Sequence, residues 1–217
     1  MEKEELQFIA SQLKKPEGEK GIEMANMMHE TNVNMTLSSI RNLHISKGDN
    51  ILELGHGNAA HLEWLMKQSS HLKYYGLEMS ELMFQEARQI NRNYVSQKQA
   101  FFLLYDGNVI PFPDAKFNKI FTVNTLYFWQ EPVKLLMEIY RVLDHKGIFS
   151  LTFAQESFMK KLPFTKFEFE LYNTEKVEKM ILKTPFNINN LETQTEKIKS
   201  KTGELVDRVF TTIVLEK

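Results

Sequence analysis

The chain has 217 residues, of which 42% are hydrophobic and 25% charged, which is typical of a soluble globular protein and excludes a fibrous or disordered chain. Its 27 Lys and Arg against 28 Asp and Glu leave a formal net charge of -1, so no basic field favours a nucleic acid or an acidic membrane surface. The absence of cysteine excludes disulfides, thiolate metal sites and cysteine nucleophiles, and we expect no metal site.

The first 45 residues have the pattern of helices. Apolar residues recur at helical spacing over residues 2–15, and this helix is expected to end at the proline and glycines of "KKPEGEKG". A second helical pattern runs from Ile22 to about Leu43 and could be broken near "HETN". We therefore predict a helical cap over residues 1–45 and a main domain over residues 46–217.

The sequence contains no run with the apolar length of a signal-peptide core or of a membrane span. The N-terminal stretch is rich in charged side chains instead. We therefore expect a cytoplasmic protein that does not act on membranes.

From Asn50 onward, short apolar runs alternate with amphipathic segments. Strands that alternate with helices predict crossover connections and a mostly parallel sheet covered on both faces, a doubly wound Rossmann-like α/β fold. Ser80 is expected to cap one of the helices, and Pro132 fits the first turn of another. The predicted strands are residues 50–54, 73–78, 100–105, 117–124 and 147–153, and the predicted helices between them are residues 58–68, 80–95 and 132–143.

The pattern weakens after Phe153. The stretches "QESFMKKLPF" and "TEKVEKMILKTPF" indicate helices. The last two stretches, "INNLETQTEKIKS" and "ELVDRVFTTIVLEK", alternate on either side of Gly203 as the strands of an antiparallel hairpin do.

The stretch "ILELGHGNAAH", residues 51–61, has the form of a glycine-rich turn between a strand and a helix. Gly55, Gly57 and Ala60 fit the spacing of a dinucleotide-binding turn, and Glu78 ends the next strand, where an acidic side chain can hold ribose hydroxyls. Glu53 distinguishes two ligands. A carboxylate beside the turn repels a pyrophosphate but attracts the ammonium and sulfonium groups of S-adenosylmethionine.

Three stretches in chain order, "ELGHGNA", "YYGLEMS" and "LYDGNVIPFPDAKFNKIFTVNTLYFW", are together similar to the motifs of class I S-adenosylmethionine-dependent methyltransferases. The resemblance covers about residues 16–153 and is strongest to the small-molecule branch that includes ubiquinone and menaquinone biosynthesis. Ala59 stands where that family usually has a third glycine. The resemblance implies a seven-stranded sheet that the C-terminal hairpin closes.

The resemblance also implies roles for single residues. Glu78 would bind the ribose hydroxyls, Met79 would lie against the adenine face, and Asp106 would accept a hydrogen bond from the adenine amino group. The implied cofactor-binding residues are Glu53, Gly55, Gly57, Asn58, Glu78, Met79, Asp106, Gly107 and Asn124.

The acceptor side is expected to include the aromatic residues of "NTLYFWQEP". Tyr127, Phe128 and Trp129 follow the fourth strand, where they could stack on an acceptor or pack in the core. Tyr127 is the ring that we expect to face the pocket. His29 in the cap is a second candidate for contact with the acceptor, unless it lies on a solvated helix face. Tyr127 and His29 are also the candidate catalytic residues, whereas we expect His56 to be a loop histidine without a catalytic role.

The predicted function is methyl transfer from S-adenosylmethionine to a small-molecule acceptor by in-line displacement, with positioning as the main catalytic contribution. The accepting atom, oxygen, nitrogen or carbon, stays open. Thr125 and Leu126 replace both prolines of the Asn-Pro-Pro-Tyr signature, which disfavours amino methylation of nucleic acids. An NAD-type oxidoreductase and a non-catalytic cofactor-binding partner protein remain as alternatives, and the protein is expected to be a monomer or a homodimer.

Overall fold

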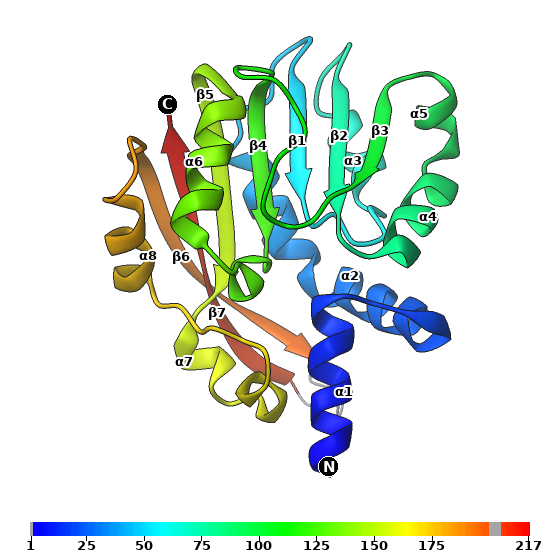
Figure 1. Cartoon of the computed structure of the whole chain (residues 1–217), viewed down its shortest axis with the longest axis vertical. Coiled ribbons are helices and arrows are strands. Elements are labelled where there is room, and N and C mark those ends of the chain that lie inside the picture. Colours follow the sequence, from blue (N-terminus) through cyan, green and yellow to red (C-terminus); the bar gives the residue numbers. More distant parts are fainter. Residues whose placement is uncertain (1, 200–204) are drawn as a thin grey trace.

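The computed structural model of the chain describes residues 2–199 and 205–217. Over these residues the chain forms a seven-stranded sheet with the strand order β3-β2-β1-β4-β5-β7-β6 (Figure 1). Strands β1 to β5 pair in parallel, and β7 is antiparallel to both β5 and β6. The predicted doubly wound fold with its closing hairpin is therefore confirmed, although the turn around Gly203 lies outside the described residues. The strands are β1 (Asn50–Leu54), β2 (Lys73–Glu78), β3 (Ala100–Leu104), β4 (Phe117–Val123), β5 (Leu143–Ala154), β6 (Asn187–Lys199) and β7 (Leu205–Glu216).

Helices cover both faces of this sheet. Alternate residues of β1 explain why both faces are apolar: Leu52 and Leu54 enter one core and Ile51 enters the other. Helices α6 and α8 pack in the first core, and α3, α4 and the end of α2 pack in the second. The helices are α1 (Lys3–Lys14), α2 (Gly18–Arg41), α3 (Leu62–Met66), α4 (Glu81–Ile90), α5 (Arg92–Ser96), α6 (Pro132–Val142), α7 (Glu156–Met159) and α8 (Thr174–Ile181), with 3-10 turns η1 (Leu126–Phe128) and η2 (Pro163–Lys166).

The two N-terminal helices lie at the edge of the sheet toward which β1, β2 and β4 point (Figure 1). Helix α2 continues along β4, β5 and β7, and the Ser39 hydroxyl lies 2.9 Å from that of Ser150 on β5. The linker between α1 and α2 is also fixed, because the Ser80 hydroxyl donates a hydrogen bond to the Pro16 carbonyl oxygen (2.6 Å) and accepts one from the Met83 backbone N–H (3.2 Å). Ser80 is thus the helix cap that the sequence predicts. Within the described ranges, no helix has the length and apolar character needed to cross a membrane.

Three helix predictions need correction. Helix α2 is continuous, without the break considered near "HETN", and it begins four residues before Ile22. The helix predicted from residue 58 begins only at Leu62, because Gly57 and Ala59 adopt positive φ angles of 54° and 48°. The helix predicted over residues 80–95 is interrupted at Asn91, whose side chain donates to the Ala59 and Ala87 carbonyl oxygens and thereby competes with the helical backbone.

Candidate functional site

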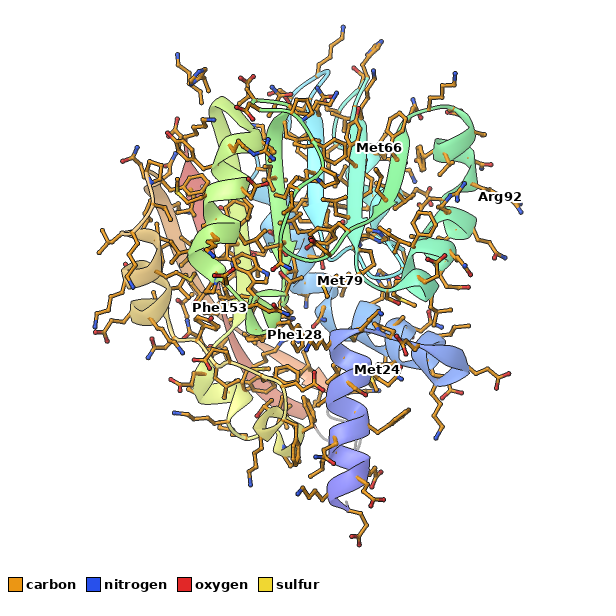
Figure 2. The ribbon with its side chains drawn as sticks, in the orientation of Figure 1. Met24, Met66, Met79, Arg92, Phe128 and Phe153 are labelled. Atoms are coloured by element: carbon orange, nitrogen blue, oxygen red, sulfur yellow. The ribbon has the colours of Figure 1, made fainter. Side chains whose placement is uncertain are left out.

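A cavity lies at the carboxyl ends of β1 to β4, and the N-terminal helices form part of its wall. In doubly wound sheets, this edge is where ligands bind. Figure 2 shows Met79 and Phe128 on the side of the sheet that faces α1 and α2, and both residues line the cavity. Helices α1 and α2 and the linker between them contribute Leu13, Lys14, Pro16, Ala25, Met28, His29, Asn32 and Thr36 to the wall.

The glycine turn after β1 forms the floor of the cavity. Gly55 has a φ of 71°, and a Cβ atom there would lie 2.4 Å from the Thr125 Cγ2 atom, so only glycine fits. Ala59 adopts the left-handed conformation at the position where the resemblance expects a glycine. Asn58 fixes the turn to α2, because its side-chain amide donates to Asn26 Oδ1 on that helix (3.2 Å).

Glu78 ends β2 with its carboxylate held by three backbone N–H groups. Oε1 accepts from Met79 (2.7 Å) and Ser80 (3.1 Å), and Oε2 accepts from Gly57 (3.0 Å). The side chain is buried but lines the cavity. No cation pairs with this carboxylate among the described residues, so its remaining lone pairs are available to accept hydrogen bonds from ligand hydroxyls.

Asp106 and Gly107 follow β3 at the same edge. Asp106 Oδ1 accepts hydrogen bonds from the backbone N–H groups of Val109 (2.9 Å) and Asn108 (2.8 Å), and these bonds lower the pKa of the Asp106 carboxyl. Gly107 has a φ of 84°, and a Cβ atom there would lie 2.9 Å from the Met79 sulfur. The absent side chain therefore leaves room for Met79, which lines the cavity beside Glu78.

Glu53 does not lie on the cavity wall, although the sequence places it beside the ligand. It is 3% exposed, and its Oε2 accepts hydrogen bonds from His61 Nε2 (2.8 Å) and the Tyr74 hydroxyl (2.5 Å). Burial, followed by the charge of Glu53, raises the pKa of Tyr74 well above its usual value. His61 lines the cavity in front of this carboxylate.

The aromatic segment after β4 divides between the core and the cavity. Tyr127 is buried, and its hydroxyl lies 3.0 Å from both Asn124 Oδ1 and the Ala154 carbonyl oxygen. Of this aromatic group, Phe128 and Trp129 line the cavity, and Tyr127 does not. The physical reason is the 3-10 turn η1, in which successive side chains point about 120° apart. The structure therefore places the ring that the sequence favoured as a substrate contact behind the wall, where it supports Asn124.

Three histidines line the cavity. Burial lowers the pKa of His29 on α2. Burial also lowers the pKa of His56, whose Nε2 is buried without a hydrogen-bond partner among the described residues, while its Nδ1 lies 2.7 Å from the Gly57 carbonyl oxygen. The sequence did not point to His61; its only signal was its place eight residues after Glu53, at the start of the following helix.

The charges of the cavity are unsuited to a pyrophosphate. Among the described lining residues, the formally charged ones are Lys14, Glu78 and Asp106, and no arginine is present. Glu78 and Asp106 lie on the cavity wall at the ends of β2 and β3, where they disfavour an anion and favour a ligand rich in hydroxyl and amino donors.

Comparisons with known proteins give a consistent result. Residues 52–151 match the family described as "Methyltransferase domain". The "Uncharacterized methyltransferase YdaC" of Bacillus subtilis (strain 168) is 29% identical over 124 residues, which are 55% of this chain and 65% of that protein. The chain thus spans slightly less than two thirds of the length of that curated relative.

Solved structures share the fold. A chain in the "Complex between the Haloferax volcanii Trm112 methyltransferase activator and the putative methyltransferase" has a TM-score of 0.70 at 15% identity, covering 87% of this chain and 92% of that one. A SAM-dependent methyltransferase from Aquifex aeolicus has a TM-score of 0.63 at 18% identity, covering 95% and 96%. At these identities the likeness establishes the fold alone.

Proposed function

We propose that this chain, which contains a class I S-adenosylmethionine-dependent methyltransferase domain, transfers a methyl group from S-adenosylmethionine to a small-molecule acceptor. In this reaction the acceptor atom forms a bond to the methyl carbon while the carbon–sulfur bond breaks, and S-adenosylhomocysteine leaves. We assign the protein to the small-molecule branch similar to the enzymes of ubiquinone and menaquinone biosynthesis. Residues 1–45 act as a cap over the main domain.

The order of the cavity residues across the sheet carries this proposal. Asp106 follows β3, Glu78 ends β2, the glycine turn follows β1, and Asn124 follows β4. These four strands are neighbours in the order β3-β2-β1-β4, so the residues form one row about 14 Å long, or three strand spacings. An adenosine with an amino-acid tail is an elongated ligand that matches such a row.

The residues present fit this cofactor. The Glu78 carboxylate, oriented by three N–H groups, suits the two ribose hydroxyls, and Asp106 suits the adenine amino group. The space that Gly107 leaves for Met79 provides an apolar surface for the adenine ring. S-adenosylmethionine supplies the activated methyl group on its sulfonium, so the protein's main contribution is to position the acceptor and exclude water.

The acceptor side is formed by Phe128 and Trp129 from the sheet edge and by His29 from α2. The aromatic rings suit stacking on a planar or cationic acceptor. Because burial lowers the pKa of His29, this histidine is neutral at physiological pH and can accept a proton from an acceptor hydroxyl or ammonium group. We propose His29 as the general base for acceptors that require one.

Calorimetric titration of the purified protein with S-adenosylmethionine, S-adenosylhomocysteine and NADH tests the cofactor. We expect saturable binding of the first two and none of NADH. Binding of NADH alone would favour the NAD-type oxidoreductase, and binding of none of the three would overturn the proposal.

Transfer of a labelled methyl group in the presence of small aromatic alcohols and amines tests the chemistry. We expect a labelled product with at least one acceptor class, and the H29N variant should lower turnover without weakening S-adenosylhomocysteine binding. Tight cofactor binding with no transfer to any small molecule would favour the non-catalytic partner protein.

A further inference from the structure

A buried group of three side chains lies behind the cavity at the end of β1. His61 Nε2 and the Tyr74 hydroxyl both contact the same oxygen of Glu53, Oε2. Glu53 and His61 are almost completely covered, with side chains 4% and 8% exposed, but His61 lines the cavity and Glu53 does not. A ligand in the cavity therefore meets the histidine ring before it meets the carboxylate.

The contact with Glu53 determines which His61 nitrogen can serve a ligand. An ionised carboxylate only accepts hydrogen bonds, so the His61 Nε2 carries a hydrogen. In the neutral ring, Nδ1 then has a lone pair, and Nδ1 has no hydrogen-bond partner among the described residues. The negative charge of Glu53 on the far side of the ring strengthens Nδ1 as an acceptor toward a cationic donor.

The position of His61 in the row of strand ends indicates the part of the ligand that it meets. Asp106 follows β3, Glu78 ends β2, and His61 contacts Glu53 of β1, the next strand in the sheet. A ligand whose adenine and ribose are held by the first two residues extends its amino-acid part to the third, about 4.8 Å beyond the ribose site. We propose that His61 Nδ1 accepts a hydrogen bond from the α-ammonium group of the cofactor's methionine part, with Glu53 fixing the ring from behind.

This inference rests on the proposed function, and a pair of ligands tests the two separately. S-adenosylhomocysteine has the amino-acid part, whereas 5'-methylthioadenosine has the same adenosine and sulfur without it. Calorimetry would measure both dissociation constants for the wild type and for His61→Gln, whose side-chain amide can still donate to Glu53 but lacks the acceptor at Nδ1. We expect His61→Gln to bind S-adenosylhomocysteine at least tenfold more weakly, while its affinity for 5'-methylthioadenosine changes less than about threefold.

His145→Gln is the matched control, because His145 is exposed and lies at the start of β5, outside the cavity lining. His61→Asn provides a second variant, since its amide oxygen can occupy the place of Nδ1. The difference in affinity between S-adenosylhomocysteine and 5'-methylthioadenosine should be larger in His61→Asn than in His61→Gln. An equal loss of both ligands in His61→Gln, or unchanged affinity for S-adenosylhomocysteine, would overturn the inference. A wild type that binds neither ligand would instead overturn the proposed function, and this inference with it.

Discussion

The Glu78 side chain accepts three backbone hydrogen bonds, whereas that of Asp106 accepts two. Its proposed contact with the ribose hydroxyls can be tested by a single substitution. Glu78→Gln replaces an oxygen that accepts backbone N–H bonds with an amide that donates, so the side chain turns away and loses its contacts with ribose hydroxyls. We expect S-adenosylhomocysteine to bind at least tenfold more weakly by calorimetry, as removal of a hydrogen bond to a charged group predicts.

Glu81→Gln is the control for that substitution, because Glu81 lies three residues further on and is exposed on α4. Thermal denaturation of both variants without ligand would separate a loss of binding from a loss of folded protein. If Glu78→Gln binds the ligand as tightly as the wild type does, the ribose assignment is wrong.

The two glycines of the turn should differ in their tolerance of alanine. Both have positive φ, which costs about 1–2 kcal/mol for a residue with a Cβ atom. At Gly55 the new atom would also meet Thr125 Cγ2 at 2.4 Å, whereas at Gly57 nothing lies within 4 Å. We therefore expect Gly55→Ala to lower the free energy of unfolding by about 2–5 kcal/mol and Gly57→Ala by about 1–2 kcal/mol, measured by urea denaturation.

The collision at Gly55 can be relieved at its partner. Thr125→Ser removes Cγ2 but keeps the hydroxyl that contacts Thr122 and accepts from Trp129 Nε1 (3.1 Å). In the Gly55→Ala background this second change should restore about 1–3 kcal/mol. Additive effects of the two substitutions would contradict the proposed contact.

Among the single residues of the site, some could be placed from the sequence and others could not. Gly55, Glu78 and Asp106 were predictable because a strand's end and the sheet's polarity fix where they lie. The direction of the Tyr127 side chain was not predictable, because the 3-10 turn η1 spans only Leu126–Phe128 and is too short to show its period in the sequence. His61 was missed because its partner, Glu53, becomes its neighbour only when the turn folds back.

Among the elements, helix α2 depends on a contact with the closing hairpin. Arg208 on β7 donates to Glu196 Oε1 on β6 (2.6 Å), to the Thr31 carbonyl oxygen (2.6 Å) and to Asn32 Oδ1 (2.8 Å). Thr31 and Asn32 are the last two residues of "HETN", where the sequence suggested a break. Because the stabilising arginine is far away in the sequence, no local pattern could predict that α2 continues.

This contact should stabilise both elements. Arg208 is 4% exposed and the Glu196 side chain is 11% exposed, so Arg208→Met leaves a largely covered carboxylate without its cation. We expect a loss of about 3–5 kcal/mol in the free energy of unfolding and faster amide hydrogen exchange over Gly18–Arg41. Arg92→Met, at an exposed position on α5 (Figure 2), should change neither quantity. Unaltered exchange in α2 of Arg208→Met would show that the hairpin does not hold the helix.

In the whole molecule, the strand order brings residues that are far apart in the sequence together in one cavity. The order of these strands could be expected only from the resemblance, since periodicity identifies strands without saying which ones pair. Because β2 and β1 lie between β3 and β4, the end of β3 and the end of β4 reach opposite ends of one cavity. The same arrangement buries His56 of the glycine turn, so the protonation of this ring affects folding.

His56 should make the stability of the molecule depend on pH. Burial lowers its pKa below the usual value of 6.5, although Glu78, Glu53 and the Gly57 carbonyl oppose this effect. Below pH 6.5 the unfolded chain therefore binds a proton that the folded chain does not bind until the pH reaches the lower, folded-state pKa. The stabilising contribution is present above pH 6.5 and is lost as the pH falls, by at most about 1.4 kcal/mol per pH unit.

Urea denaturation between about pH 5 and pH 7 measures this dependence. His56→Asn removes the titrating group while its amide can still donate to the Gly57 carbonyl oxygen, which His56 Nδ1 contacts, so its stability should fall less on acidification than that of the wild type. Burial also lowers the pKa of His29. Because His29 is present in both proteins, its effect on the pH dependence of stability has the same sign in both and cancels in the comparison. His145→Asn, at an exposed position, should match the wild type. Equal slopes for His56→Asn and the wild type would mean that water reaches the buried Nε2 and that the ring titrates as it does in the unfolded chain.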